Sequence, residues 1–268
     1  MRKNSFRDRT ELLLGPVTME KMSKMCIAVA GLGGVGGAVL MTLARMGFQR
    51  FRIADPASFD EPDMNRQWAA MSETLGQNKA HVYEHFIRSI NPEAEVVVFD
   101  KGVTVENAEE FVDGSHFVVE ALDIMRVLPE TRQKVCAEAR KCGIPVMLAV
   151  IIGFATVVAI SSPSGMPLTP FLEFIESARC KGKLPVKLVE VLNPVVLKIM
   201  GEKMAQGTIP SISLATGLVS AVASTEILMA LCGETVPGGR PPVYLPEVTF
   251  VDISKQIYQI RRIEEFKV

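Results

Sequence analysis

The stretch Cys26-Ile-Ala-Val-Ala-Gly-Leu-Gly-Gly-Val-Gly-Gly37 carries the fold signal from which the rest of the chain can be interpreted. A short apolar run stops at glycines, and a helical pattern follows through Ala44 to Gly47. This order predicts a strand, a glycine turn and a helix. In such a unit Gly31-x-Gly33-x-x-Gly36 lets the backbone approach a phosphate, and the free N–H groups of the helix face that anion. The stretch therefore indicates a nucleotide site.

The next strand pattern ends in a carboxylate. Residues 51–55, Phe-Arg-Ile-Ala-Asp, are typical of a second strand, and Asp55 follows the glycines at about the separation of a ribose-binding acid. Together the two features favour a dinucleotide-binding or ATP-binding fold.

Strand and helix patterns alternate through the first 160 residues. Further strands are predicted at 94–100, 115–122, 144–152 and 156–161, and helices at 76–90, 106–112 and 125–142. This alternation predicts a Rossmann-like, doubly wound α/β fold with a mostly parallel sheet, whose ligands lie at the carboxyl ends of the strands. Asp55 and Asp123 both follow strands at such ends.

The pattern loosens in the second half of the chain. Helical fragments at 170–178 and 197–205 are separated by proline-containing segments, which suits a crossover or lid. A small-residue helix is predicted at 212–231, apolar nearly all round and therefore buried. Its serines, threonines and Glu226 favour a core or interface helix over a membrane span.

We interpret the chain as one domain, 1–268. It comprises an N-terminal helical arm (1–25), a nucleotide-binding core (26–160), a crossover or lid segment (161–210), and a buried helix with C-terminal strands (211–268). The last two strands, at 247–252 and 256–262, are expected to extend the sheet in antiparallel fashion.

Composition excludes several classes of protein. Of 268 residues, 29 are basic and 30 acidic, so no general attraction to nucleic acid or a membrane is expected. The charged segment 1–9 lacks the apolar region of a signal peptide, which favours a cytoplasmic location. The five cysteines contain no CxxC pair, which argues against a disulfide framework or a four-cysteine zinc site.

Several motifs together resemble the ubiquitin-activating (E1-like) superfamily, in its bacterial ThiF/MoeB/HesA branch. They are Gly31-Leu-Gly-Gly-Val-Gly36, Asp55, Arg66-Gln67, Gly76-x-x-Lys79-Ala80 and Ala121-Leu-Asp123. The resemblance covers roughly residues 7–160, with a weaker similarity at 211–233. It implies an enzyme that uses Mg·ATP to adenylate a carboxylate and releases pyrophosphate.

The resemblance also implies roles for individual residues around the nucleotide. The glycine turn would be formed by Gly31, Gly33, Gly34 and Gly36. Asp55 would accept hydrogen bonds from the ribose hydroxyls, and Gln67 would add polar support. Arg66 and Lys79 would hold the triphosphate and neutralise charge that develops on the α-phosphorus and on pyrophosphate.

Two further roles follow from the resemblance. Asp123 would bind Mg²⁺, which prefers hard oxygen ligands. Arg9, in Arg9-Thr-Glu-Leu-Leu-Leu-Gly15, resembles an N-terminal arginine that reaches the γ-phosphate from the partner subunit. The resemblance therefore predicts a homodimer with an arginine finger in trans.

The chain departs from the family pattern at several points. Asp63 stands where the family usually has an asparagine, an added charge that would repel triphosphate, and nearby Asn65 is the candidate substitute. The chain also lacks the zinc-binding CxxC pairs of many sulfur-carrier activators. Cys180, flanked by basic residues, lies where some E1-like enzymes carry an acceptor cysteine, and whether it forms a thioester or persulfide stays open.

Four functions are compatible with these features. The favoured one is adenylation of the C-terminal glycine of a small ubiquitin-fold carrier protein or of a peptide. A tRNA threonylcarbamoyladenosine-cyclising dehydratase is an alternative, and its zinc-free members have a similar N-terminal arm, but the net charge shows no basic surface for tRNA. A catalytically silent scaffold subunit is less favoured because Arg66, Lys79 and Asp123 are all retained. An NAD-dependent dehydrogenase is less favoured because it would leave the spacing of Arg66 and Lys79 unexplained.

Overall fold

The computed structural model describes residues 5–124, 126–169, 172–173 and 192–262. Cys180 and nearly all of the predicted helix 170–178 lie outside the described residues, so the proposals for them stay predictions.

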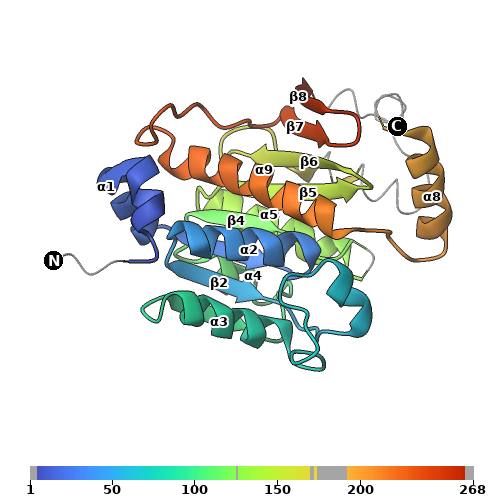
Figure 1. Cartoon of the computed structure of the whole chain (residues 1–268), viewed down its shortest axis with the longest axis horizontal. Helices are drawn as coiled ribbons and strands as arrows, with labels where there is room; N and C mark the ends of the chain where they lie inside the picture. Colours follow the sequence, from blue (N-terminus) through green and yellow to red (C-terminus); the bar gives the residue numbers. More distant parts are fainter. Residues whose placement is uncertain (1–4, 125, 170–171, 174–191, 263–268) are drawn as a thin grey trace.

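The described strands form one sheet with the order β3-β2-β1-β4-β5-β6-β7-β8 (Figure 1). The strands are β1 Cys26–Ala30, β2 Arg50–Ala54, β3 Glu95–Phe99, β4 Phe117–Glu120, β5 Val146–Ile152, β6 Ala155–Ser161, β7 Glu247–Asp252 and β8 Ile257–Arg262. The pairs from β3 to β5 are parallel, and those from β5 to β8 are antiparallel. The predicted doubly wound sheet with an antiparallel C-terminal extension is confirmed.

Helices cover both faces of this sheet. They are α1 Asp8–Lys24, α2 Gly34–Met46, α3 Lys79–Ile90, α4 Ala108–Val112, α5 Pro129–Lys141, α8 Pro194–Ala205 and α9 Ser213–Cys232, with a short 3-10 helix η1 at Glu61–Asn65. Buried residues of α1, α2, α3 and α9 form one core layer, and those of α4 and α5 the other. Ile27 and Val29 of β1 face the first layer and Ala28 the second, as strand alternation requires.

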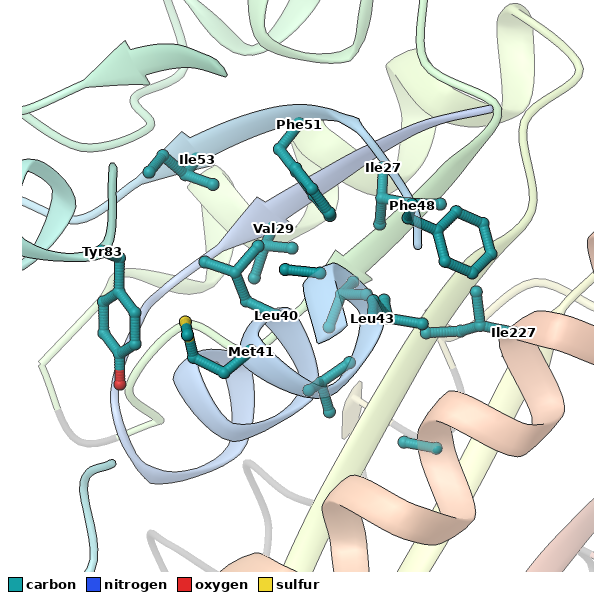
Figure 2. Close-up of a cluster of buried hydrophobic side chains, with 14 of the residues drawn as sticks. Ile27, Val29, Leu40, Met41, Leu43, Phe48, Phe51, Ile53, Tyr83 and Ile227 are labelled. Carbon is teal, nitrogen blue, oxygen red and sulfur yellow. The ribbon is translucent and has the colours of Figure 1, made fainter. Parts of the chain in front are cut away.

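The core between β1 and α2 fixes the glycine turn in space. Figure 2 shows Leu40 and Leu43 of α2 directed toward Ile27 and Val29 of β1, with Ile227 of α9 beside them. All five side chains are fully shielded from solvent. The strand and the helix that flank the turn are therefore held by a common apolar contact.

The small-residue helix α9 packs against α2, β5 and β6. By length and composition it is the one helix of the described chain that would suffice to span a membrane. Its buried Glu226 accepts hydrogen bonds from Arg240 and from the Val243 N–H, which stabilise a carboxylate inside this fold. The predicted burial holds for one face of α9 only, since Ala215 and Val219 are fully buried whereas Leu214 is 62% exposed. One face of α9 is left open because the helix forms an outer layer of the domain.

The N-terminal arm α1 contains a bend at Gly15, where φ is +78°, followed by Pro16. It lies against the end of α9, and Thr18 donates a hydrogen bond to the Thr235 carbonyl oxygen at 2.6 Å. Its outer side exposes Leu12 and Leu13, at 88% and 74%. The arm is therefore anchored by one face only.

Candidate active site

A cavity of about 390 Å³ opens at the carboxyl ends of the parallel strands. Its lining includes most of the predicted site residues, namely Gly31, Gly33, Gly34, Asp55, Arg66, Gln67, Lys79 and Asp123. Pockets of this size bind nucleotide-sized molecules. Residues that the sequence places up to 92 positions apart, from Gly31 to Asp123, thus share one cavity.

The glycine turn is set by close backbone contacts. Gly31 has φ of +88°, and a Cβ there would lie 2.3 Å from the Ala121 carbonyl oxygen. A Cβ on Gly36 would lie 1.9 Å from the Gly31 carbonyl oxygen, so Gly36 closes the turn without lining the cavity. α2 begins at Gly34, so its first N–H groups are directed at the cavity.

Asp55 holds this turn from the end of β2. Its carboxylate accepts a hydrogen bond from the Leu32 N–H at 2.7 Å and another from the Ala57 N–H at 2.9 Å. Each carboxylate oxygen has a second lone pair, so these bonds leave acceptor capacity toward the cavity. The ribose contact stays a prediction, and the observed role of Asp55 is to brace the turn.

Lys79, Asp63 and Gln67 form a buried network on one wall of the cavity. The Lys79 Nζ lies 2.9 Å from an Asp63 carboxylate oxygen and donates to the Gln67 Oε1 at 3.0 Å, while the Gln67 amide donates to Asp63. Burial by itself raises the pKa of Asp63, but the hydrogen bond and charge of Lys79, together with hydrogen bonding to Asp60, outweigh it and hold that pKa below its ordinary value. The triphosphate-binding lysine of the prediction therefore already has an anionic partner.

Arg66 is held by the loop that carries it. Its Nη1 donates to the Pro62 carbonyl oxygen and to the Asn65 Oδ1, both at 2.9 Å. Asn65 in turn donates to the Ser211 carbonyl oxygen at 3.0 Å. Asn65 is not among the residues that line the cavity, so the geometry gives it the positioning of Arg66 rather than contact with a ligand.

Asp123 lies just after β4, in a segment fixed by a buried ion pair. Arg132 of α5 contacts Glu120 at 2.9 Å and also donates to the Leu122 carbonyl oxygen, and the Leu122 N–H donates to Glu120 at 3.0 Å. Burial raises the pKa of Glu120, and the charge of Arg132 opposes that rise. These contacts orient the chain on which Asp123 sits, and its side chain is half exposed in the cavity wall.

The residues present fit Mg²⁺ bound together with phosphates. Mg²⁺ is usually held by one or two carboxylates and by substrate oxygens and water, not by an all-protein cage. The described residues contain no cluster of three or more His, Cys, Asp or Glu that would hold a metal alone. Asp123 would supply a carboxylate ligand, with Arg126 placed 3.7 Å from it.

Sequence reasoning missed Glu120, Arg132 and Arg126. Glu120 interrupts an otherwise apolar run at 117–122, and a charged residue in a buried strand requires a partner. The charged residue in the strand therefore predicts a buried ion pair. It does not identify Arg132 as the partner, because the position of Arg132 depends on how α5 packs.

Asp63→Asn is expected to tighten ATP binding and to weaken folding. The change removes a negative charge from the cavity and releases Lys79 for phosphate. It also removes the charged partner of Lys79, which costs about 1–3 kcal/mol of folding free energy at neutral pH. Because folding lowers the pKa of Asp63, this stabilisation is present above the unfolded pKa and is lost as the pH falls through the folded pKa.

Calorimetric ATP titration and urea unfolding between pH 3 and 7 test the expectation. The stability difference between wild type and variant should shrink toward the acid end. Equal ATP affinity in the two proteins would show that the Asp63 charge does not oppose the nucleotide.

Arg9 is not brought into the cavity of its own chain. The arm lies at the C-terminal end of α2, where a Cβ on Gly47 would contact Met19 and Arg7. The cavity lies at the other end of α2, at Gly34. A helix of 13 residues spans about 20 Å, more than an arginine side chain reaches.

The fold and the cavity together define a Rossmann-like α/β protein with a nucleotide-type site at the carboxyl edge of its sheet. The chain belongs to the ThiF family, whose pattern matches residues 8–267.

Named relatives align over part of the chain. A tRNA threonylcarbamoyladenosine dehydratase of Bacillus subtilis is 37% identical over 116 residues, 43% of this chain and 46% of that protein. A sulfur carrier protein adenylyltransferase of Thermus thermophilus is 29% identical over 147 residues, 55% of this chain and 53% of that protein. The chain thus aligns with about half the length of these relatives.

A solved structure has the same fold over a larger part of this chain than these sequence alignments cover. The E. coli tRNA N6-threonylcarbamoyladenosine dehydratase in complex with ATP superposes with a TM-score of 0.61 at 21% identity. The match covers 85% of this chain and 94% of that one.

Proposed function

We propose that this protein adenylates a carboxylate with Mg·ATP. The observation that carries the proposal is the single cavity in which the start of α2, Arg66, Lys79 and Asp123 meet. A helix N-terminus and two cations suit a triphosphate, and a carboxylate suits its magnesium ion. An ATP complex of a protein with the same fold supports the choice of nucleotide.

The reaction needs charge stabilisation more than covalent catalysis. A carboxylate oxygen of the substrate attacks the α-phosphorus, the bond from the α-phosphorus to the bridging oxygen breaks, and pyrophosphate leaves with that bond's electron pair. The products are an acyl adenylate and pyrophosphate. Arg66 and Lys79 neutralise the charge that develops on the phosphate oxygens, and Lys79 exchanges Asp63 for phosphate when the nucleotide binds.

The nucleotide preference gives the first test. Calorimetric titration is expected to show binding of Mg·ATP and little or no binding of NAD, because the cavity holds two phosphate-directed cations and a magnesium ligand. Tight NAD binding without ATP binding would overturn the proposed function.

The carboxylate belongs to a small protein or peptide, and the C-terminal glycine of a ubiquitin-fold carrier is the first candidate. The Thermus thermophilus relative, a sulfur carrier protein adenylyltransferase, supports this class. A second candidate is cyclisation of threonylcarbamoyladenosine in tRNA, which the Bacillus subtilis relative supports.

A silent scaffold is disfavoured, since Arg66, Lys79 and Asp123 line one cavity. ATP–pyrophosphate exchange with candidate carriers and with tRNA distinguishes the three.

The proposed assembly is a homodimer in which Arg9 completes the partner's site. Arg9 lies too far from its own cavity, on an arm whose outer side exposes Leu12, Leu13 and Val17. Burial of this surface against a second copy would remove it from water and place the arms between subunits.

A further inference from the structure

Residues of β5, β6 and α8 give the cavity an apolar wall. It is formed by Leu148, Val150 and Ile152 of β5, Val157 of β6, and Met200 and Met204 of α8. We call this part the apolar end. Leu148, Ile152, Val157 and Met200 are each no more than 5% exposed, so its wall is part of the packed core.

The apolar end lies on the far side of Asp123 from Asp55. Asp55 follows β2 and Asp123 follows β4, and the sheet order β2-β1-β4-β5 puts β5 beyond both. Strands lie about 4.8 Å apart, so β2 and β5 are separated by roughly 14 Å. A nucleotide with its ribose at Asp55 and its magnesium at Asp123 therefore leaves the apolar end to whatever attacks the α-phosphorus.

β5 also offers a free edge at this place. Its pairing with β4 ends at Leu148, opposite Glu120, while its pairing with β6 continues to Ile152. Among the described residues, no strand pairs with residues 149–152 on the β4 side. An extended peptide pairs with such an edge through its main chain, and pockets beside the edge select its side chains.

We propose that the apolar end binds a bulky apolar side chain within the last two residues of the carboxylate substrate, a peptide or protein tail in extended form. The inference rests on the proposed function. A tail ending in two glycines would leave this wall uncovered, and a charged residue there would be packed against apolar side chains. The site therefore selects tails with a residue such as leucine beside or at the carboxyl end.

Four nonhydrolysable acyl-adenylate mimics test the selection without knowledge of the natural substrate. They are sulfamoyl adenosines that carry acetyl-Gly-Gly, acetyl-Leu-Gly, acetyl-Gly-Leu and acetyl-Glu-Gly. Calorimetry should show at least one leucine compound binding about tenfold or more tighter than the Gly-Gly compound, and the glutamate compound no tighter than it. Equal or tighter binding of the Gly-Gly compound would overturn the inference.

Two matched variants on α8 test whether the preference for the leucine compounds arises at the apolar end. Met204→Glu places a charge in the apolar end, while Ile199→Glu changes a residue on the same helix that is 48% exposed and does not line the cavity. Met204→Glu should remove the advantage of the leucine compound and leave ATP affinity unchanged, and Ile199→Glu should behave as wild type.

The outcomes separate the two proposals. If Met204→Glu weakens ATP as much as it weakens the leucine compound, the apolar end holds the adenine and the inference is wrong, while ATP binding still supports the proposed function. If wild type binds neither ATP nor any of the four compounds, the proposed function fails and the inference with it.

Discussion

Asp123→Asn is expected to lower carboxylate adenylation by about 10²-fold or more, with the fold retained. The amide keeps the shape of the side chain but lacks the charge that attracts Mg²⁺. Asp123 is half exposed, and its segment is fixed by Glu120 and Arg132, so the substitution should not disturb packing. The loss should appear in ATP–pyrophosphate exchange with an active substrate and in the magnesium-dependent part of ATP binding.

A matched control keeps this result interpretable. Asp113→Asn makes the same chemical change at an exposed residue after α4 that does not line the cavity, and it should leave both measurements unchanged. Exchange close to the wild-type rate with Asp123→Asn at saturating magnesium would show that Asp123 has a structural role only.

The parallel half of the fold could be predicted because its signals are local. Each apolar run from β1 to β5 stops at a glycine or an acid. The amphipathic pattern of 76–90 gives α3 with Lys79 in its first turn, as predicted, although the helix begins at Lys79, after the N-cap Asn78, and not at residue 76. The extent to which α9 is buried could not be predicted, because a helix of small and apolar residues has the same pattern in an outer layer as in a central one. Only the packing of α2 and the sheet decides which face is covered.

Some residues of the cavity could also be predicted, because the strand pattern alone places them at one edge of the sheet. Residues at the carboxyl ends of parallel strands meet, so Asp55 and Asp123 follow from the topology alone. The positions of Arg66 and Lys79 relative to Asp63 depend on η1 and its loop, whose hydrogen bonds have no periodic signature. The sequence flagged Asp63 as a charge that would repel phosphate, and the structure adds that this charge is paired with Lys79.

Arg9→Ala and Asp123→Ala are each expected to inactivate the enzyme, and mixed dimers of the two are expected to regain activity. The reason is geometric: Arg9 lies at the opposite end of α2 from its own cavity, so any contact it makes with nucleotide is with the partner's. In a mixed dimer the subunit that keeps Asp123 receives an intact Arg9 from the other chain, whereas the reciprocal site lacks both residues.

The size of the rescue follows from twofold symmetry. Random exchange of equal amounts makes half of the dimers mixed, and each mixed dimer has one working site out of two, so about a quarter of the wild-type activity per chain should return. Exchange after partial unfolding is followed by mass spectrometry of the intact dimers, and adenylation is measured on the same samples. As a control, Asp113→Asn is mixed with Asp123→Ala in the same way, which shows how subunit exchange by itself affects activity. If mixed dimers are present and no activity returns, Arg9 does not act on the partner's nucleotide, and the assignment of the arm to the neighbouring site is wrong.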